Sequence, residues 1–272
     1  MPELPEVETI RRDLEKLIVG YKILDITANS PKQIQPSLKV VKKALLGTTI
    51  KKVGRRAKIL QIFFDNGAII IVHLKLTGRL LFRDQKEPVD DYQHVVFSLS
   101  KGKELRFADA RKFGWVRLVK NEKELKEFLK DFGPEPLSDL NLAVFQKILS
   151  SSYRPIKIIL MDQKKISGVG NIYANEALFL AGINPLQPAD KISKEKTKKL
   201  YQSLEKALQL GLRYRGASDN DYLDALGHKG SYQEHFLVYG QQGKSCPQCF
   251  GLIKRIKVGG RGTFYCPNCQ PL

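Results

Sequence analysis

The first eight residues, Met1-Pro2-Glu3-Leu4-Pro5-Glu6-Val7-Glu8, include the groups best suited to covalent chemistry. Removal of Met1 would leave Pro2 with a free amine, and an α-amine with a pKa of about 8 is partly unprotonated at neutral pH. A secondary amine forms a cationic iminium with an aldehyde-like carbon, and an iminium accepts the electrons released in an elimination. Glu3 and Glu6 are close enough in sequence to donate or relay protons.

A helix start explains the same residues without chemistry. Proline is favoured in the first turn of a helix, where acidic side chains complement the helix dipole. Downstream, apolar residues recur at helical spacing and are followed by a glycine, namely Val7, Ile10, Leu14, Leu17 and Gly20. Spacing alone favours this structural interpretation, because acidic helix starts are common. Both interpretations can hold at once.

The four cysteines form two Cys-x-x-Cys pairs separated by sixteen residues, at Cys246, Cys249, Cys266 and Cys269. Two such pairs build a tetrahedral thiolate site for Zn²⁺. We expect one structural Zn²⁺, because four thiolates leave no ligand position open for catalysis. Between the pairs lies a basic hairpin, in which glycines on both sides would let Arg261 approach a backbone closely.

A glycine-rich turn, Gly168-Val169-Gly170-Asn171, precedes a helical pattern. Such a turn points backbone N–H groups at a phosphate, and Asn171 as the cap residue could add its side-chain amide. Gly-x-Gly alone is a weak signal. A dinucleotide-binding fold is excluded, because no strand precedes the turn and the third glycine is missing.

The composition favours a polyanionic partner. The chain has 46 Lys and Arg against 28 Asp and Glu, a net charge of +18. A field of this sign attracts nucleic acid and speeds association with it, although a cationic surface can also serve solubility. From His235 to Leu272 the chain has five basic residues and no acidic one.

The sequence predicts a cytoplasmic protein without a membrane partner. The N-terminus is acidic and amphipathic, unlike a signal peptide. No apolar run approaches the roughly 20 residues that a bilayer requires. The spacing of the cysteines points to metal rather than to disulfides.

Alternating apolar residues predict strands at 21–30, 48–56, 59–64, 68–76, 79–83, 92–99, 104–108 and 115–119. Asn66-Gly67 and Lys101-Gly102 predict turns, and Asn121 with Glu124 predicts a helix start. Helical patterns follow at 138–151, 154–165, 171–182 and 193–212. Strands first and helices second predict an α+β fold, with an antiparallel β-sandwich flanked by the N-terminal helix.

The breaker cluster Gly133-Pro134-Glu135-Pro136 is the candidate hinge. We therefore expect an N-terminal β-sandwich domain at 1–132, a hinge at 133–137, a helical domain at 138–234 and a four-cysteine zinc finger at 235–272.

The opening Met-Pro-Glu-Leu-Pro-Glu-Val-Glu-Thr resembles the start of the bacterial formamidopyrimidine-DNA glycosylases, which remove oxidised purines such as 8-oxoguanine. Similar motifs span almost the whole chain, at His73–Gly78, Asp109–Gly114, Ile156–Gln163 and Ser167–Glu176. The resemblance implies a helix–two-turn–helix element at the last of these motifs and a zinc-finger hairpin at the cysteines.

The resemblance also implies catalytic roles. Pro2 would attack the anomeric carbon of the sugar, Glu3 would protonate the ring oxygen, and Glu6 would support both. Lys58 would contact a phosphate and assist base excision. Arg261 would grip the phosphates that flank the lesion and take part in the second elimination.

Three side chains are implied to fill the gap left by the flipped nucleotide: Leu76, Arg111 and Phe113. The family has Met where this chain has Leu76, an apolar wedge of similar volume. Further DNA contacts are implied for His73, His94, Lys157 and Asn171. Residues 213–235 match the loop that closes over the extruded base, although Ala225-Leu226-Gly227 departs from the family pattern and bears on lesion choice.

We therefore predict a monomeric, bifunctional DNA glycosylase and AP lyase of base excision repair. Its partner would be double-stranded DNA that contains oxidised bases or abasic sites. The Leu-Pro-Glu-Val start and the long 213–235 loop favour oxidised purines. One alternative is an endonuclease VIII-like enzyme for oxidised pyrimidines. The other is a non-catalytic binder of damaged DNA, against which the presence of Pro2, Glu3 and Lys58 argues.

Overall fold

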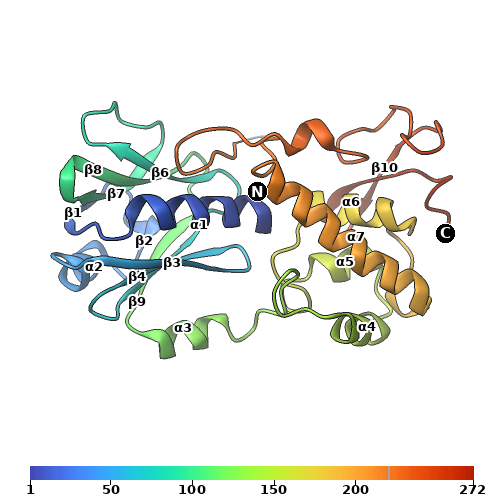
Figure 1. The fold of residues 1–272 in the computed structure, drawn as a ribbon, viewed down its shortest axis with the longest axis horizontal. Helices are drawn as coiled ribbons and strands as arrows, with labels where there is room; N and C mark the ends of the chain where they lie inside the picture. The colour runs from blue at the N-terminus through green and yellow to red at the C-terminus, as the bar shows by residue number, and fades with distance from the viewer. Residues whose placement is uncertain (220) are drawn as a thin grey trace. The chain divides into compact units, whose positions relative to one another are not determined.

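The computed structural model describes residues 1–219 and 221–272, and the chain divides into two compact units (Figure 1). The first unit comprises Met1–Lys130 and Tyr214–Ser231, and the second comprises Asp131–Arg213 and Tyr232–Leu272. By its contacts, the segment Tyr214–Ser231 therefore belongs with the N-terminal unit, although it follows the helices in sequence. The hinge at 133–137 and the four-part division of the chain stay predictions.

Two β-sheets form the first unit. The four-stranded sheet is antiparallel and has the order β1 (Ile23–Ala28), β7 (Gln93–Leu99), β8 (Lys103–Asp109) and β6 (Gly78–Asp84). The five-stranded sheet has the order β2 (Ile34–Gln35), β9 (Trp115–Val119), β5 (Ile69–His73), β4 (Ile59–Phe64) and β3 (Ile50–Arg56). The expected antiparallel sandwich is thus confirmed, except that the short edge strand β2 pairs parallel with β9.

Turn chemistry sets the strand ends as the sequence predicted. The side-chain oxygen of Asn66 accepts the N–H of Ala68 at 3.0 Å, and Gly67 takes a φ of +84° between β4 and β5. Both sheets then contribute to one apolar core, which includes Ile26, Val95, Phe107, Ile62, Val72 and Val116.

Helix α1 (Leu4–Ile18) packs on β3, β4 and β6 with one apolar face. Leu4, Val7, Ile10 and Leu14 are all at most 1% exposed. Pro5 lies in the first turn, as the structural interpretation of the N-terminus predicted. The helix start is therefore real, and it fixes where Pro2 and Glu3 lie.

Two more helices complete the first unit. Helix α3 (Glu122–Leu129) begins as predicted, because the Asn121 side chain accepts the N–H of Glu124 at 3.0 Å. Helix α2 (Leu38–Leu45) was not predicted. Its signals were the cap at Ser37 and the buried pair Val41 and Leu45 at i, i+4 spacing.

The second unit contains four α-helices and one hairpin among its described residues: α4 (Leu142–Ser150), α5 (Ile156–Met161), α6 (Asn171–Ala181), α7 (Lys194–Arg213), β10 (Lys254–Val258) and β11 (Arg261–Tyr265). Short 3₁₀ turns in the chain lie at Pro31–Gln33, Ser100–Gly102, Ala189–Lys191 and Tyr232–His235. All four predicted helices exist. Helix α4 starts later than expected because the Asn141 side chain caps the N–H of Val144.

None of the helices in the described ranges is long and apolar enough to span a membrane.

Candidate active site

The N-terminal segment is held by one carboxylate. Glu3 and Glu6 are 3% and 1% exposed, and Pro2 is buried. One oxygen of Glu6 accepts the N–H of Glu3 at 2.8 Å, and the other accepts the N–H of Ala217 at 2.8 Å. Because both oxygens accept backbone N–H groups, Glu6 fixes the chain that leads to Pro2. This geometry gives Glu6 a positioning role beside the supporting role that the resemblance implied.

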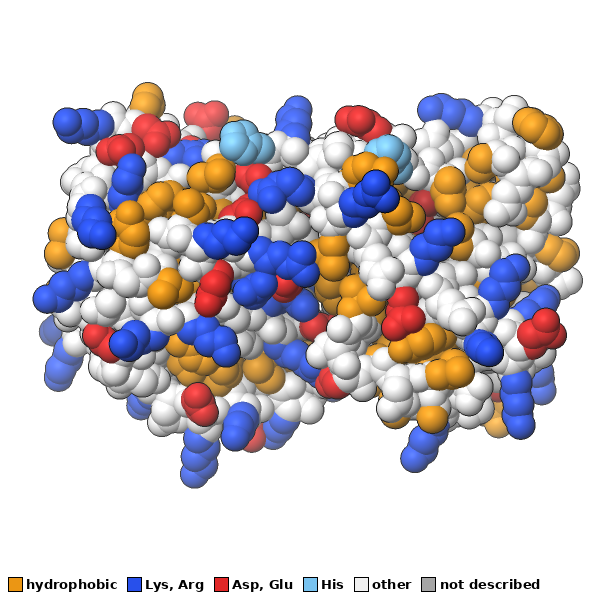
Figure 2. Space-filling view, viewed as in Figure 1, with side chains coloured by type: hydrophobic (Ala, Val, Ile, Leu, Met, Phe, Trp, Pro, Cys, Tyr) orange, Lys and Arg blue, Asp and Glu red, His pale blue; other side chains and the backbone are white. Residues whose placement is uncertain are grey.

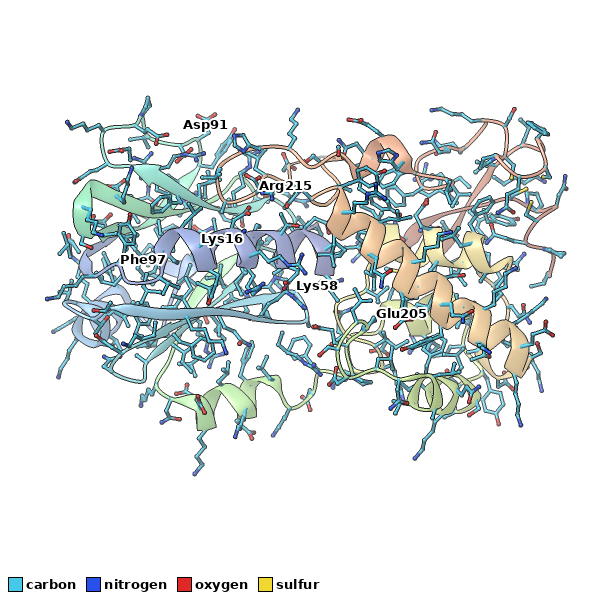
Figure 3. All side chains as sticks on the ribbon, in the orientation of Figure 1. Lys16, Lys58, Asp91, Phe97, Glu205 and Arg215 are labelled. Carbon is cyan, nitrogen blue, oxygen red and sulfur yellow. The ribbon has the colours of Figure 1, made fainter. Side chains whose placement is uncertain are left out.

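Lys58 lies in the two-residue turn between β3 and β4, where Ala57 takes a φ of +52°. Arg55 donates to Glu8 of α1 at 3.0 Å and to the carbonyl of Ala57 at 2.8 Å, which places this turn next to the start of α1. Figure 3 shows Lys58 there. Lys58 is 6% exposed and is therefore not an exposed cation at a strand end.

His73 is kept neutral by its surroundings. Burial, then the charges of Lys75 and Lys58, lower the pKa of His73 to about 3. Its Nδ1 accepts the N–H of Lys75 at 3.0 Å, and its ring packs edge-on against Trp115. At neutral pH the ring can offer a phosphate only a neutral Nε2–H. The predicted DNA contact of His73 stays a prediction.

This neutral His73 predicts a loss of stability in acid. In the unfolded chain its pKa returns to about 6.5, so the unfolded state binds more protons below that pH. His73 therefore leaves the free energy of unfolding unchanged above about pH 6.5. As the pH falls below this value, the free energy of unfolding decreases, by up to about 2 kcal/mol between pH 7 and pH 5. Urea unfolding followed by Trp115, the single tryptophan, measures it. We expect His73→Gln to reduce this pH dependence and the exposed control His235→Gln to retain it. Equal pH dependence in wild type and His73→Gln would contradict the assignment.

The three predicted gap-filling residues lie on two loops of the first unit. Leu76 is half-buried in the turn before β6, and Arg111 and Phe113 follow β8. Phe113 is 54% exposed, and the Arg111 guanidinium lies 5.0 Å from the centre of its ring. An exposed phenylalanine paired with an arginine has the chemistry of a wedge for a base stack. Their insertion into DNA stays a prediction.

Asp109, at the end of β8, connects these two loops and was missed by the sequence reasoning. It is 1% exposed, and its carboxylate accepts the hydroxyl of Thr77, the N–H of Arg111 at 3.2 Å and the N–H of Gly114 at 2.6 Å. A Cβ at Gly114 would come within 2.8 Å of Phe107, so the loop closes tightly around the carboxylate. Asp109 therefore sets the positions of both loops.

We expect Asp109→Asn to misplace these loops while the rest of the sheet stays folded. The amide of asparagine would turn an N–H group toward one of the donors and leave it unsatisfied, which costs about 1–3 kcal/mol. Base excision should then fall at least about tenfold. The matched control is Asp91→Asn, an exposed site labelled in Figure 3. Single-turnover excision assays measure both variants, and wild-type rates for Asp109→Asn would refute the role.

His94 is 7% exposed and makes hydrogen bonds within the protein. Its Nε2 lies 3.0 Å from the carbonyl oxygen of Asp109, and its Nδ1 lies 3.2 Å from the side-chain oxygen of Asn29. These contacts indicate that His94 helps to hold the backbone at Asp109, where β8 ends. Its predicted DNA contact stays a prediction.

In the second unit, the prediction that Asn171 caps a helix is wrong. Gly170 is the cap residue of α6, with φ −134° and ψ −155°, and Asn171 is the first helical residue. The Asn171 side chain instead donates to the carbonyl of Gly262 at 3.1 Å. The first-turn N–H groups of α6 are still the candidate phosphate site of this unit.

Lys157 converges on the same carbonyl. It is 1% exposed, and its ammonium group donates to the carbonyl of Gly262 at 3.0 Å and to the hydroxyl of Thr263 at 2.6 Å. A buried cation needs such partners. Lys157 and Asn171 thus hold the start of β11, and their predicted DNA contacts stay predictions.

Arg261 is exposed at the tip of the β10–β11 hairpin. It pairs with Val258 across a two-residue turn, Gly259-Gly260, whose φ values of +55° and +77° suit a type I′ turn. Lys157 and Asn171 bind the residue after Arg261, so α5 and α6 set the direction in which this arginine leaves the unit.

Helix α6 also holds the chain that enters the zinc-finger region through Glu176, another residue that sequence reasoning missed. Glu176 is fully buried and accepts the N–H groups of Leu237, Val238 and Tyr239 at 2.9–3.0 Å. Burial raises the pKa of Glu176, although these three hydrogen bonds favour its charged form. One side chain of α6 therefore holds three consecutive backbone N–H groups of the segment that enters the zinc-finger region.

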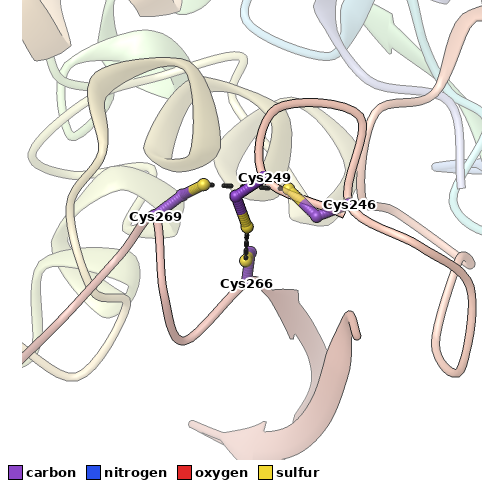
Figure 4. A group of neighbouring side chains, drawn as sticks. All are labelled: Cys246, Cys249, Cys266 and Cys269. Atoms are coloured by element: carbon purple, nitrogen blue, oxygen red, sulfur yellow. Dashed lines mark hydrogen bonds between the residues drawn. The ribbon is translucent and has the colours of Figure 1, made fainter. Parts of the chain in front are cut away.

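The four cysteine sulfurs lie within 4.8 Å of one another (Figure 4). Sulfurs around a tetrahedral Zn²⁺ at about 2.3 Å from the metal would be about 3.8 Å apart. Two pairs, Cys246–Cys269 at 3.7 Å and Cys249–Cys266 at 3.4 Å, are near that spacing. Burial and the neighbouring sulfurs raise the pKa of Cys269, so a thiolate at this position requires a cation beside it. The site fits one structural Zn²⁺.

Basic side chains are spread over the face drawn in Figure 2, as the net charge of +18 predicts. Such a surface supplies the non-specific attraction to a phosphate backbone.

Three protein families match consecutive parts of the chain. Residues 1–116 match the formamidopyrimidine-DNA glycosylase N-terminal domain, and residues 132–221 match the formamidopyrimidine-DNA glycosylase H2TH domain. Residues 243–272 match the zinc finger found in FPG and IleRS. The matches therefore cover the two sheets up to the start of β9, the α6 region and the four cysteines.

Curated relatives and solved structures are similar over the full length. The formamidopyrimidine-DNA glycosylase of Pelotomaculum thermopropionicum is 42% identical over 99% of both chains, and that of Bacillus cereus is 38% identical over 100% of this chain and 99% of its own. The Lactococcus lactis Fpg in complex with abasic-site DNA is 37% identical, with a TM-score of 0.93 over 99% of this chain and all of that one. A glycine-to-proline mutant of the same protein, bound to Fapy-dG DNA, gives 0.94 over all of both chains.

Proposed function

The chain belongs to the formamidopyrimidine-DNA glycosylase family, and we propose on this premise that it is a bifunctional DNA glycosylase and AP lyase. Its substrates are oxidised purines and abasic sites in double-stranded DNA, and its process is base excision repair. The observation that carries the proposal is the full-length similarity to an Fpg that was solved with both abasic-site and Fapy-dG DNA. We place the reaction in the bacterial cytoplasm, where the DNA is.

In the reaction we propose, the amine of Pro2, freed by removal of Met1, attacks the anomeric carbon of the damaged nucleotide. The bond to the base breaks, and Glu3 protonates the ring oxygen as the sugar opens. The resulting iminium accepts electrons when the 3′ phosphate leaves by β-elimination, and the 5′ phosphate leaves next by δ-elimination. The product is a gap of one nucleotide with phosphate at both ends. Buried Glu6 and Lys58, close to the start of α1, support the N-terminus in this chemistry.

DNA recognition in this proposal combines two sets of residues. Leu76, Arg111 and Phe113 fill the gap left by the flipped nucleotide, supported by Asp109. Arg261 and the first turn of α6 bind phosphates, with Lys157 and Asn171 holding the hairpin. A bound Zn²⁺ would stabilise the fold of this hairpin and take no part in the reaction.

Oxidised pyrimidines are the second candidate substrate. The L. lactis Fpg, which matches with a TM-score of 0.93, was also solved with DNA that contains an oxidised pyrimidine. Substrate choice therefore has to be measured on a panel of lesions.

The test is strand cleavage of a duplex that carries 8-oxoguanine opposite cytosine, by zinc-loaded protein from which Met1 has been removed. We expect products with phosphate at both ends of the gap. Faster cleavage of oxidised-pyrimidine duplexes would assign the enzyme to the endonuclease VIII-like specificity. Tight binding to every damaged duplex without cleavage would assign a non-catalytic binder.

A further inference from the structure

Arg215 has a backbone conformation that residues other than glycine rarely adopt. Its φ is +57°, and Gly216 follows with a φ of +85°. The left-handed region is unfavourable for residues other than glycine, and such residues persist where the surrounding structure holds them. The side chain of Arg215 therefore has to make contacts that compensate for this conformation.

Those contacts join two parts of the first unit. The Nη2 atom of Arg215 lies 2.6 Å from a carboxylate oxygen of Asp13 on α1 and 2.6 Å from a carboxylate oxygen of Asp224. Asp224 is 1% exposed and also accepts the N–H of Leu226 at 3.0 Å and of His228 at 2.9 Å. We call the three residues Arg215, Asp13 and Asp224 the Arg215 bridge.

The segment held by the bridge runs directly to the N-terminal chemistry. Ala217, two residues after Arg215, donates its N–H to Glu6, whose other oxygen holds Glu3. A Cβ at Gly216 would lie 2.8 Å from Cγ of Glu6, so the contact is close-packed. The Arg215 bridge thus fixes the backbone that covers Glu6.

The base of a damaged nucleotide is bonded to the same carbon that Pro2 attacks. It must therefore lie within a few ångströms of the segment that contains Glu3 and Glu6, whereas an abasic sugar places no base there. A contact that sets the backbone beside Glu6 can then affect base excision without affecting cleavage at an abasic site.

We propose that Arg215 is a positioning residue that determines specificity: through Asp13 and Asp224 it holds the backbone at Gly216 and Ala217, beside Glu6, where this backbone contacts the base. The inference rests on the proposed function. Base excision and abasic-site cleavage should therefore respond differently to loss of the Arg215 bridge, because only the substrates that have a base depend on it. The hydrogen bond from the N–H of Phe82 on β6 to the carbonyl of Ala225, at 2.8 Å, does not involve Arg215, so Ala225 should stay docked on β6 in the variants.

The first experiment compares Arg215→Gly with wild type in single-turnover assays on two duplexes, one with 8-oxoguanine opposite cytosine and one with a preformed abasic site. Glycine removes the bridge and suits the left-handed backbone, so the variant separates the side chain from backbone strain. We expect base excision to fall at least about tenfold. Abasic-site cleavage should stay within about twofold of wild type. Equal losses on both duplexes, or no loss on either, would overturn the proposal.

Two further variants define the bridge itself. Asp13→Asn removes one of its carboxylates and should lower excision in the same selective way, whereas Arg215→Lys keeps a cation and should restore part of the rate. The matched control is Asp25→Asn, which breaks a surface ion pair with Lys42 in the same unit and should leave both rates unchanged. The double variant Arg215→Gly with Asp13→Asn should be no worse than Arg215→Gly alone, because both remove one bridge.

Hydrogen exchange gives a readout that does not depend on the substrate. The amides of Ala217, Leu226 and His228 should exchange at least about tenfold faster in Arg215→Gly than in wild type. Unchanged protection would refute the Arg215 bridge even if excision fell. A wild-type protein that cleaves neither duplex would refute the proposed function instead, and the exchange result would still decide whether the bridge exists.

Discussion

Pro2→Gly is expected to lower strand cleavage of an 8-oxoguanine duplex by at least about 100-fold, the range of a lost nucleophilic or acid–base contribution. Glycine keeps a terminal amine, but a primary amine gives a neutral imine that must gain a proton before it can accept electrons. Proline forms the cationic iminium directly. Trapping with borohydride measures the step, because reduction of the iminium leaves a covalent protein–DNA complex that runs separately on a denaturing gel.

The matched control for this experiment is Pro5→Ala. It changes a proline in the same segment, in the first turn of α1, and leaves the terminal amine untouched. We expect this control to form the trapped complex at close to the wild-type level. Full trapping with protein that retains Met1, in which the Pro2 nitrogen lies in a peptide bond, would show that another group is the nucleophile. Strand cleavage by Pro2→Gly at the wild-type rate would show that a secondary amine is not required.

Loss of the metal site is expected to abolish tight DNA binding while the first unit stays folded. Structural zinc sites contribute on the order of 10 kcal/mol to the folding of small fingers, more than the β10–β11 hairpin could supply alone. In Cys249→Ser the hairpin should lose its shape, and Arg261 should no longer be held. The affinity for a duplex with an abasic-site analogue should fall at least about 100-fold, the equivalent of two charge-assisted contacts of roughly 1.5 kcal/mol each.

Fluorescence anisotropy with a labelled duplex measures the affinity, and Asn268→Ser is the control. Asn268 is exposed and lies between the two cysteines of the second pair, so the control introduces a serine and keeps all four sulfurs. Trp115 lies in the first unit, and its urea-unfolding midpoint should be the same in both variants. Wild-type affinity in Cys249→Ser would contradict the role of the metal site in holding Arg261.

Local patterns were sufficient for most of the secondary structure. The strand at 59–64 and the turn at Asn66-Gly67 were predicted because alternation and turn chemistry act between near neighbours in the chain. The strand β2 was missed because it is two residues long and its parallel pairing with β9 depends on distant residues. Helix α2 was missed because it is short, although its cap and spacing are local. The cap of α6 lies one residue before the predicted Asn171, because Gly170 takes the extended backbone of a cap residue.

The sequence by itself determined the chemistry that this protein can perform: a proline next to two glutamates, four cysteines at zinc spacing and an arginine between glycines. Each of these signals lies within a short stretch, where residue types and spacing limit what can form. Only the tertiary structure decided which residues position them. The bonds from Glu6 to Ala217, from Lys157 to Gly262 and from Arg215 to Asp13 join residues that are 211, 105 and 202 positions apart in the chain. Such pairs form only after distant segments have packed, so no local pattern in the sequence records them.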